Sequence, residues 1–330
     1  MSSLMEQNYL TDTSQIPETS HWDFVPTVIY CSAYGVQTFD ALQQALFKLH
    51  AYIILKSGDI IAIKHFLNLK GHNSIFPCHS CKVKAVHGLG KIYYVPLHPP
   101  SQDCHERTLY QAAPLQHHKD FLNITERISA AKTKTKKAKI AKGMGIKGLP
   151  GLSHVRSLDY THSSAWEWFH LFLKNIILNL VDFWTGQFKE LGPGIEDFEI
   201  APEIWQEIGK ETAAAVWHIP STFVCVLVNI ANDHSLFTVE SWCFWFVHLS
   251  PKLLEGCFLK CKYYKHMCEL VEIMKITLQF HTPHKQLDGI ESHIIDWVQK
   301  YEKYYYQYDI EHLLACTLTI HRLLHVVQGI

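Results

Sequence analysis

The sequence has no apolar run long enough to cross a membrane. A spanning helix needs about 20 consecutive apolar residues, whereas the strongly apolar segment from Phe223 to Val228 is far shorter. An N-terminal signal pattern of basic, apolar and small residues is absent as well. These absences predict a chain without a membrane partner in a reducing compartment, where its ten cysteines remain thiols.

Net charge is almost absent too. The formal charge at pH 7 is −1 and charged residues make up 18% of the chain, so no global positive field attracts nucleic acid and any basic footprint must be local. Hydrophobic residues make up 48% of the 330 residues. This composition predicts a globular protein of one large or two ordinary domains with a sizeable core.

The first third of the chain is predicted to contain an α/β unit. After a disordered start over 1–22, the pattern predicts a strand within 24–34, a helix over 40–50, a buried strand over 52–55 and a helix over 60–69. This alternation indicates an α/β core over 23–100.

The remainder is predicted to be helical. Residues 101–160 are rich in lysine and glycine and are expected to form a partly mobile connector that contains a polar helix near 119–129. Residues 161–330 show helical spacing of apolar side chains, with aromatic stretches that are most simply core packing. Helices are expected at 166–185, 202–217, 235–250, 251–280, 287–305 and 310–327.

Asp59 lies between the predicted strand and the helix that follows it. Open α/β sheets place their chemistry at the carboxyl ends of strands, where a carboxylate could hold a divalent metal ion for phosphodiester cleavage. The alternative is a helix cap, because an Asp directly before a helix accepts hydrogen bonds from the first backbone N–H groups. Spacing alone favours the cap.

Cys78 and Cys81 form a C-x-x-C pair in a proline-bounded loop. Such a pair is commonly half of a tetrahedral zinc site, and His72, His87 and His98 are candidates for its other ligands. A thioredoxin-like redox pair would open a helix directly after a strand, whereas this pair follows a helix. The spacing therefore favours structural zinc over a redox pair or two reduced thiols.

A second group of similar residue types comprises Cys257, Cys261, His266 and Cys268. On one helix the three cysteines would share a face and His266 would point elsewhere. Buried thiols in a core helix are the better interpretation.

A local cluster of lysines is the one basic footprint, formed by Lys132, Lys134, Lys136, Lys137 and Lys139. Each could contact a DNA phosphate in a salt-dependent, sequence-independent way. A solvated connector or a nuclear-import patch would have the same composition, and the solvated connector is slightly favoured.

Several motifs, taken in order, resemble those of a known family. They are SGDI, GHNSIFPCHSCKV, YYVPLHPP, GIKGLPGLS, HLFLKNIILNLVDFWTGQFK, YEKYYYQYD and LACTLTIHRLLH. Their combination is similar to fungal transposases, the basidiomycete relatives of the CACTA (En/Spm) and plavaka DDE-type elements, over about 36–330. The resemblance implies a ribonuclease-H-like α/β core interrupted by a large helical insertion. It also implies Mg²⁺- or Mn²⁺-dependent transposition of DNA in the nucleus, with a homo-oligomer as one possible assembly.

The resemblance assigns roles to residues that match its motifs. Asp59 matches the second catalytic aspartate, which reverses the preference for a cap, and Cys78, Cys81 and His72 match the Cys-rich segment. The family carries Asp-x-x-His-Leu and then Glu-Asn at the head of its long helix. Here Glu167 and His170 occupy the first of these motifs, and Lys174 replaces the glutamate of the second.

The other catalytic carboxylates have no clear match. The first would lie on an early strand, where Asp23 is only a weak candidate, and the third would follow the helical insertion, where the sequence ends at Ile330. A two-metal site reduced to one ligand should not hold its metals. We therefore expect a truncated or degenerate, inactive transposase with a partial ribonuclease-H-like core. The alternative is a non-enzymatic, zinc-stabilised module that binds DNA or protein.

Overall fold

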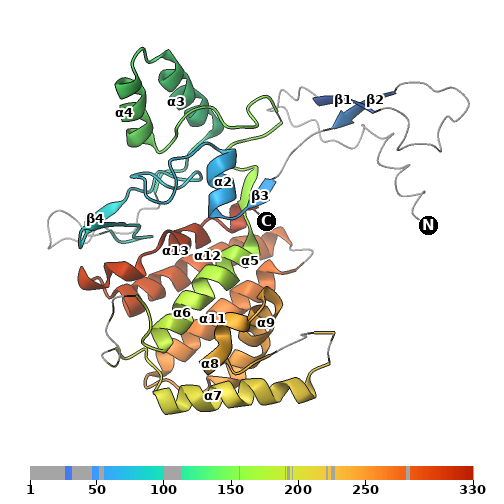
Figure 1. Ribbon diagram of the computed structural model, residues 1–330, viewed down its shortest axis with the longest axis vertical. Helices are drawn as coiled ribbons and strands as arrows, with labels where there is room; N and C mark the ends of the chain where they lie inside the picture. The colour runs from blue at the N-terminus through green and yellow to red at the C-terminus, as the bar shows by residue number, and fades with distance from the viewer. Residues whose placement is uncertain are drawn as a thin grey trace, which may run out of the picture.

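The computed structural model describes residues 27–31, 47–51, 56–99, 113–155, 157–189, 191, 194, 196–220, 222–223, 227–279 and 283–329. The predicted disordered start, Asp23 and the predicted strand over 52–55 lie outside these residues. The described chain is mostly helical, with a few short strands (Figure 1). None of its helices is long and apolar enough to cross a membrane.

The strands form three two-stranded sheets within the described residues. β1 (Thr27–Cys31) pairs antiparallel with β2 (Phe47–Ala51), and β4 (Val86–Gly88) pairs antiparallel with β5 (Lys91–Tyr93). β3 (Lys56–Gly58) pairs in parallel with β6 (Ser164–Trp166). This small strand content agrees with the predicted combination of α/β and helical parts.

The helices are α2 (Ile60–Phe66), α3 (His118–Ala130), α4 (Lys134–Met144), α5 (Trp168–Leu171), α6 (Ile177–Trp184), α7 (Pro202–Ala215), α8 (Ile230–Asp233), α9 (Val239–Phe244), α10 (Ser250–Leu253), α11 (Cys261–Thr277), α12 (His284–Tyr301) and α13 (Leu318–Leu323). π-helical turns occupy Phe172–Ile176, Trp245–Leu249 and Glu302–Tyr306, and short 3₁₀ segments occupy Val216–His218, His234–Leu236, Glu311–Ala315 and Val327–Gly329.

Three predicted helices differ from the structure. The one expected over 310–327 consists of a 3₁₀ segment, α13 and a second 3₁₀ segment. The last residues of the helix expected over 40–50 belong to β2, and the sequence Phe47-Lys48-Leu49-His50 has the alternation of apolar and polar residues that is typical of a strand. The helix expected over 251–280 is two helices, because the chain turns between α10 and α11 through Gly256 at a φ of 76°. The predicted long helix over 166–185 is confirmed as α5, a π-helical turn and α6.

The segment predicted as a connector contains the helical hairpin α3–α4. Phe121 and Ile128 of α3 and Ala141 of α4 are buried in one cluster with Ile63 and Leu67 of α2. α4 begins at the cap Thr133 and ends at Gly145, which adopts a φ of 73°. The lysines of this segment are consequently displayed on a packed, capped helix.

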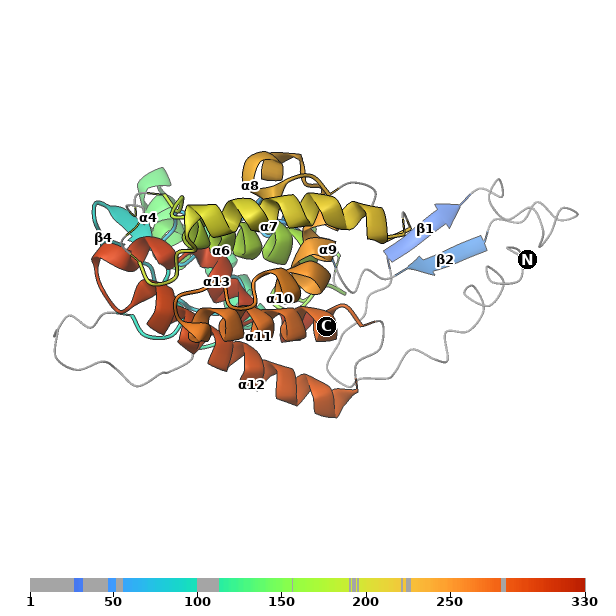
Figure 2. The same cartoon turned by 90° about the horizontal axis from the view of Figure 1, so that it is seen from below.

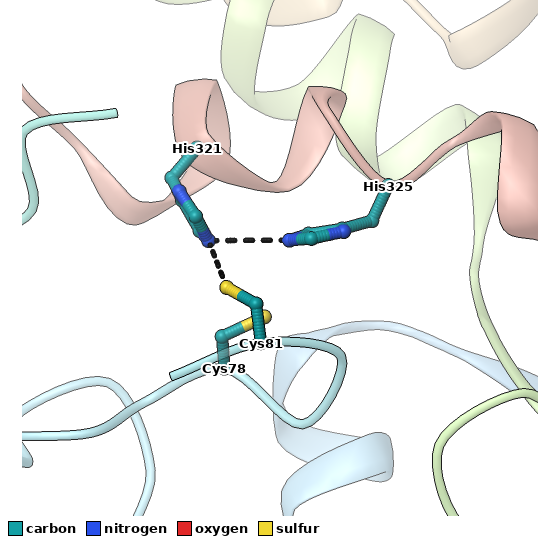
Figure 3. Close-up of side chains that lie close together, drawn as sticks. All are labelled: Cys78, Cys81, His321 and His325. Carbon is teal, nitrogen blue, oxygen red and sulfur yellow. Dashed lines mark hydrogen bonds between the residues drawn. The ribbon is translucent and has the colours of Figure 1, made fainter. Parts of the chain in front are cut away.

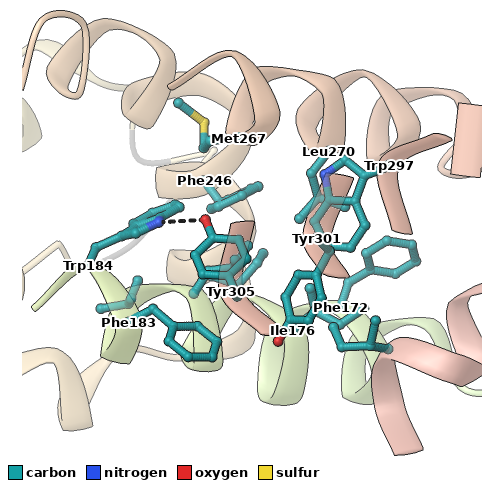
Figure 4. Packing of buried hydrophobic residues seen from close by; sticks show 14 of the residues in the cluster. Phe172, Ile176, Phe183, Trp184, Phe246, Met267, Leu270, Trp297, Tyr301 and Tyr305 are labelled. Carbon is teal, nitrogen blue, oxygen red and sulfur yellow. Dashed lines mark hydrogen bonds between the residues drawn. The ribbon is translucent and has the colours of Figure 1, made fainter. Parts of the chain in front are cut away.

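The helical part is built around an aromatic core. Trp184, Trp297, Tyr301 and Tyr305 are fully or almost fully buried and belong to one continuous cluster (Figure 4), which also includes the buried Trp245. Their polar atoms are paired, as buried Trp and Tyr require: Trp184 Nε1 donates to Tyr305 Oη at 3.2 Å, and Trp297 Nε1 donates to the carbonyl of His266 at 2.9 Å. Seen from below, α7 lies across one side of this bundle and α12 across the other (Figure 2).

A buried carboxylate connects the helical part to the segment after β5. Glu302 is fully buried, and its Oε1 accepts hydrogen bonds from the backbone N–H of Leu97 at 2.7 Å and of His98 at 3.2 Å. His98 Nδ1 lies 2.6 Å from Glu302 Oε2. This contact joins residues about two hundred positions apart and sets the α/β unit against the helices.

Replacing Glu302 with alanine is expected to lower the free energy of unfolding by about 3 kcal/mol, because two buried backbone donors and His98 lose their acceptor. Glu126→Ala removes an exposed glutamate from α3 and should change it by less than about 0.5 kcal/mol. Urea unfolding of both variants measures the difference. Equal stability of the two variants would contradict this role for Glu302.

Candidate metal centre and carboxylate pocket

Two thiols and two imidazoles meet at the buried interface between the Cys-rich loop and α13. The ligand atoms of Cys78, Cys81, His321 and His325 all lie within 4.8 Å of one another, and all four residues are buried. The cysteines come from the loop after α2, and the histidines come from α13 and the turn that follows it (Figure 3). In the part of the chain that the structure describes, this is the only cluster of three or more such side chains.

The separation of the two imidazole nitrogens matches that in a tetrahedral metal site. His321 Nε2 lies 3.1 Å from Cys81 Sγ and 3.3 Å from His325 Nε2. Zinc–nitrogen bonds of about 2.0–2.1 Å in a tetrahedron place two nitrogen ligands about 3.3 Å apart. The cluster therefore could hold a metal ion with four protein ligands and no open position.

The loop that carries the thiols is held by a neighbouring segment. Gln116 Nε2 donates to the carbonyls of Cys78 at 2.8 Å and Cys81 at 2.9 Å, and the Gln116 N–H donates to the carbonyl of Ser80. Between the two cysteines, buried His79 Nε2 lies 2.9 Å from the carbonyl of Ser164 in β6. These contacts orient both thiols toward α13 before any metal binds.

The electrostatics of the cluster favour a thiolate. Burial alone would raise the pKa of Cys78, but hydrogen bonds from Cys81, His321 and His325 and the charge of His325 hold the pKa well below its usual value. The hydrogen bond to Cys78 and burial raise the pKa of Cys81, and burial lowers the pKa of His321. A thiolate at Cys78 and a neutral imidazole at His321 are protonation states that metal binding requires.

The structure brings together the two predicted cysteines but not the predicted histidines. His72 is exposed and lines a different pocket, while His98 is paired with Glu302. His87 is exposed on β4. The ligand set proposed from sequence neighbours is therefore corrected to His321 and His325, which are more than two hundred positions away.

A sequence signal for the missed ligands exists in the segment HRLLH. His321 and His325 have the H-x-x-x-H spacing that places two imidazoles on one helical face and forms the second half of many zinc sites. The usual signature has about a dozen residues between its halves. Here the two halves are 240 residues apart, so spacing alone could not join them.

The predicted catalytic residues line one pocket. Asp59 follows β3 and Glu167 follows β6, and because these strands are parallel their carboxyl ends lie at the same edge. The Glu167 N–H donates to the carbonyl of Gly58 at 3.0 Å. Together with His170 and the exposed His72 they line a cavity of about 390 Å³, hereafter the carboxylate pocket.

Both carboxylates act as helix caps. Asp59 Oδ1 accepts from the N–H of Ala62 at 2.6 Å, which confirms the cap that spacing favoured. Glu167 accepts from the N–H groups of Phe169 at 2.9 Å and His170 at 2.7 Å and contacts His170 Nδ1. Partial burial alone would raise the pKa of Glu167, but these hydrogen bonds hold that pKa below its usual value. A role in binding a divalent metal ion stays a prediction.

The other predicted sites lie apart from both centres. Lys132, Lys134, Lys136, Lys137 and Lys139 are all exposed, four of them on α4. In the second Cys-rich group Cys261 is exposed and begins α11, whereas His266 is fully buried against Trp297 at 4.4 Å between ring centroids. The expected row of buried thiols is therefore wrong, and His266 is the member that belongs to the core.

Comparisons of this chain with protein-family models, with curated proteins and with solved structures found no match.

The ligand set can be tested with Co²⁺, whose thiolate complexes absorb light and which accepts tetrahedral S₂N₂ sites. His321→Asn and His325→Asn are each expected to weaken Co²⁺ binding by more than about 100-fold. Replacing a residue that only hydrogen-bonds to a metal ligand already lowers metal affinity by about 10–100-fold. His72→Asn and His98→Asn should leave the titration unchanged. Loss of binding in His72→Asn with retention in His321→Asn would contradict this assignment.

Proposed function

We propose that this chain is a zinc-stabilised DNA-binding protein of DDE-transposase descent. The observation that carries the proposal is the buried Cys78, Cys81, His321 and His325 cluster. Two sulfur and two nitrogen ligands in a closed tetrahedral arrangement are characteristic of structural zinc, whereas catalytic zinc keeps a position for water or substrate. Zinc there would fix the C-terminal helix α13 to the Cys-rich loop.

The DNA partner is supported by charge placement and by the motif resemblance. The chain as a whole has no positive field, so DNA binding requires a local basic surface. The exposed lysines of α4 form such a surface on a hairpin whose apolar side packs on α2. A ribonuclease-H-like origin, with action in the nucleus on transposon-end DNA, is consistent with the parallel pairing of β3 and β6 but rests on the motifs.

The proposal places DNA binding, and not DNA cleavage, on this chain. Asp59 and Glu167 are committed to capping α2 and α5, and no third carboxylate joins them among the described residues that line the pocket. Two-metal phosphodiester chemistry needs several carboxylates with free oxygens directed at the ions. The alternative is an enzyme that binds Mg²⁺ or Mn²⁺ at Asp59 and Glu167. It is favoured because these residues follow the carboxyl ends of two paired parallel strands.

DNA binding through α4 predicts a change in salt dependence. Replacing Lys136, Lys137 and Lys139 together with glutamine is expected to weaken duplex DNA binding and to reduce the slope of log K against log salt by about 1 to 3. The matched control replaces Lys210, Lys252 and Lys275 with glutamine. These lysines lie outside α4, and each is paired with a glutamate three residues away. Fluorescence anisotropy between low and moderate salt measures both slopes.

Equal slopes in the two triple variants would contradict a role for α4. Adding Mn²⁺ to the same mixtures separates the binding protein from the enzyme. We expect no more strand cleavage from the native chain than from Asp59→Asn. Cleavage that Asp59→Asn abolishes would replace the proposed function with the catalytic alternative.

A further inference from the structure

Arg322 is a buried cation with two unpaired guanidinium nitrogens. It is 2% exposed, and its Nε and Nη1 atoms have no hydrogen-bond partner among the described residues. A guanidinium stays protonated in proteins at neutral pH. A buried, charged donor without an acceptor is costly and rare in folded proteins, and it demands an explanation.

The guanidinium lies at the wall of the carboxylate pocket. Its Cζ atom is 3.8 Å from the ring centroid of Trp166, and both residues line the pocket. Trp166 Nε1 is also buried without a partner among the described residues. Two side chains in the wall of one cavity thus carry buried N–H donors without an acceptor, and an acceptor-rich ligand in the cavity would satisfy them.

The charges around the pocket restrict what that ligand can be. Asp59 and Glu167 line the same cavity as Arg322, while His72 and His170 add ionisable imidazoles. The two acids already accept helix N–H groups, so they leave the donors of Arg322 and Trp166 unpaired. A phosphate offers more acceptor oxygens than a carboxylate, so that one oxygen can accept from the guanidinium while others accept from the indole N–H or from a protonated imidazole.

We propose that Arg322 and Trp166 form a phosphate-binding subsite in the carboxylate pocket, and that the Cys78, Cys81, His321 and His325 centre positions Arg322 for it. Under the proposed function, on which this choice of ligand source rests, the phosphate belongs to the backbone of a DNA strand. Arg322 acts as a binding residue. The bidentate geometry of a guanidinium suits phosphate better than the point charge of a lysine.

The link to the metal centre follows from position on α13. Arg322 lies between His321 and His325 in sequence, so two metal ligands bracket it within about one helical turn. Successive helical residues point in different directions, which lets the histidines face the Cys-rich loop while Arg322 reaches Trp166 of β6. Metal bound to the histidines would fix this part of the chain, and removal of the metal would release Arg322.

The subsite is tested with inorganic phosphate on the full, zinc-loaded chain. Isothermal titration calorimetry is expected to give phosphate binding that Arg322→Gln weakens at least about tenfold and Arg322→Lys weakens less. Arg127→Gln, the same change at an exposed position on α3, should bind as the native chain does. Removal of zinc by a chelator should weaken binding as much as Arg322→Gln. Unchanged binding in Arg322→Gln would overturn the subsite, and unchanged binding after chelation would overturn its link to the metal centre.

A measurement on the native chain covers the case in which Arg322→Gln does not fold. The sequence has four arginines, Arg107, Arg127, Arg156 and Arg322, so its arginine Nε–H resonances are few, and the one absent from Arg322→Lys identifies Arg322. Phosphate should shift that resonance selectively. A resonance that does not move would overturn the proposal.

The source of the phosphate is tested with a short single-stranded oligonucleotide. It should produce the same shift of the Arg322 resonance and compete with inorganic phosphate. A phosphate response without an oligonucleotide response would overturn the DNA assignment. If the proposed function is wrong, salt-dependent DNA binding through α4 will be absent while Arg322 still responds to inorganic phosphate. Failure of the proposed function can therefore be distinguished from failure of the subsite.

Discussion

The arrangement of this protein depends on one constraint. Two thiols of the Cys-rich loop meet two imidazoles from the other end of the chain. Cys81 and His321 are 240 positions apart and their ligand atoms are 3.1 Å apart. Fixing so large a loop costs chain entropy that grows only slowly with its length. A bound metal ion would offset that cost through ligand bonds that an unfolded chain cannot assemble. The α/β unit and the helical bundle would thereby be joined into one structure.

Other long-range contacts also join the α/β unit to the helical bundle. Glu302 accepts the backbone N–H groups of Leu97 and His98 from within the bundle, and Arg322 stacks on Trp166 of β6. The short strands alone would be weak, since two-stranded sheets are marginal in water. β4, β5 and β6 are held because they pack against the core of the bundle, with its buried tryptophans and tyrosines.

Much of the helical part followed from the sequence because local patterns decide it. The long aromatic helix, the helix over 202–215 and the one beginning near 284 follow from apolar periodicity and from Pro at a helix start. The Asp59 cap followed from its place before an apolar helix. Errors occurred where tertiary pairing decides, as at Phe47–Ala51, and where a glycine at positive φ breaks a helix, as at Gly256.

Only the cysteine half of the candidate metal site could be predicted from the sequence. C-x-x-C is a local signal and gave Cys78 and Cys81, whereas their partners depend on how the chain closes on itself. His72 and His98 were favoured because they are near in sequence, but His98 has a carboxylate partner in Glu302 and His72 faces another pocket. The pair His321 and His325 has the right helical spacing, and nothing local connects it with a loop at the other end of the chain. Arg322 carried no sequence signal, since its significance arises only from burial without a partner.

X-ray absorption at the zinc edge of the purified full-length chain tests this account most directly. It predicts about one zinc per chain with two sulfur ligands at about 2.3 Å and two imidazole nitrogens at about 2.0–2.1 Å. The Cys243→Ser variant, which removes a half-buried thiol outside the cluster, should give the same spectrum. A chain without zinc, or a zinc shell of oxygen atoms that His321→Asn leaves unchanged, would contradict the account.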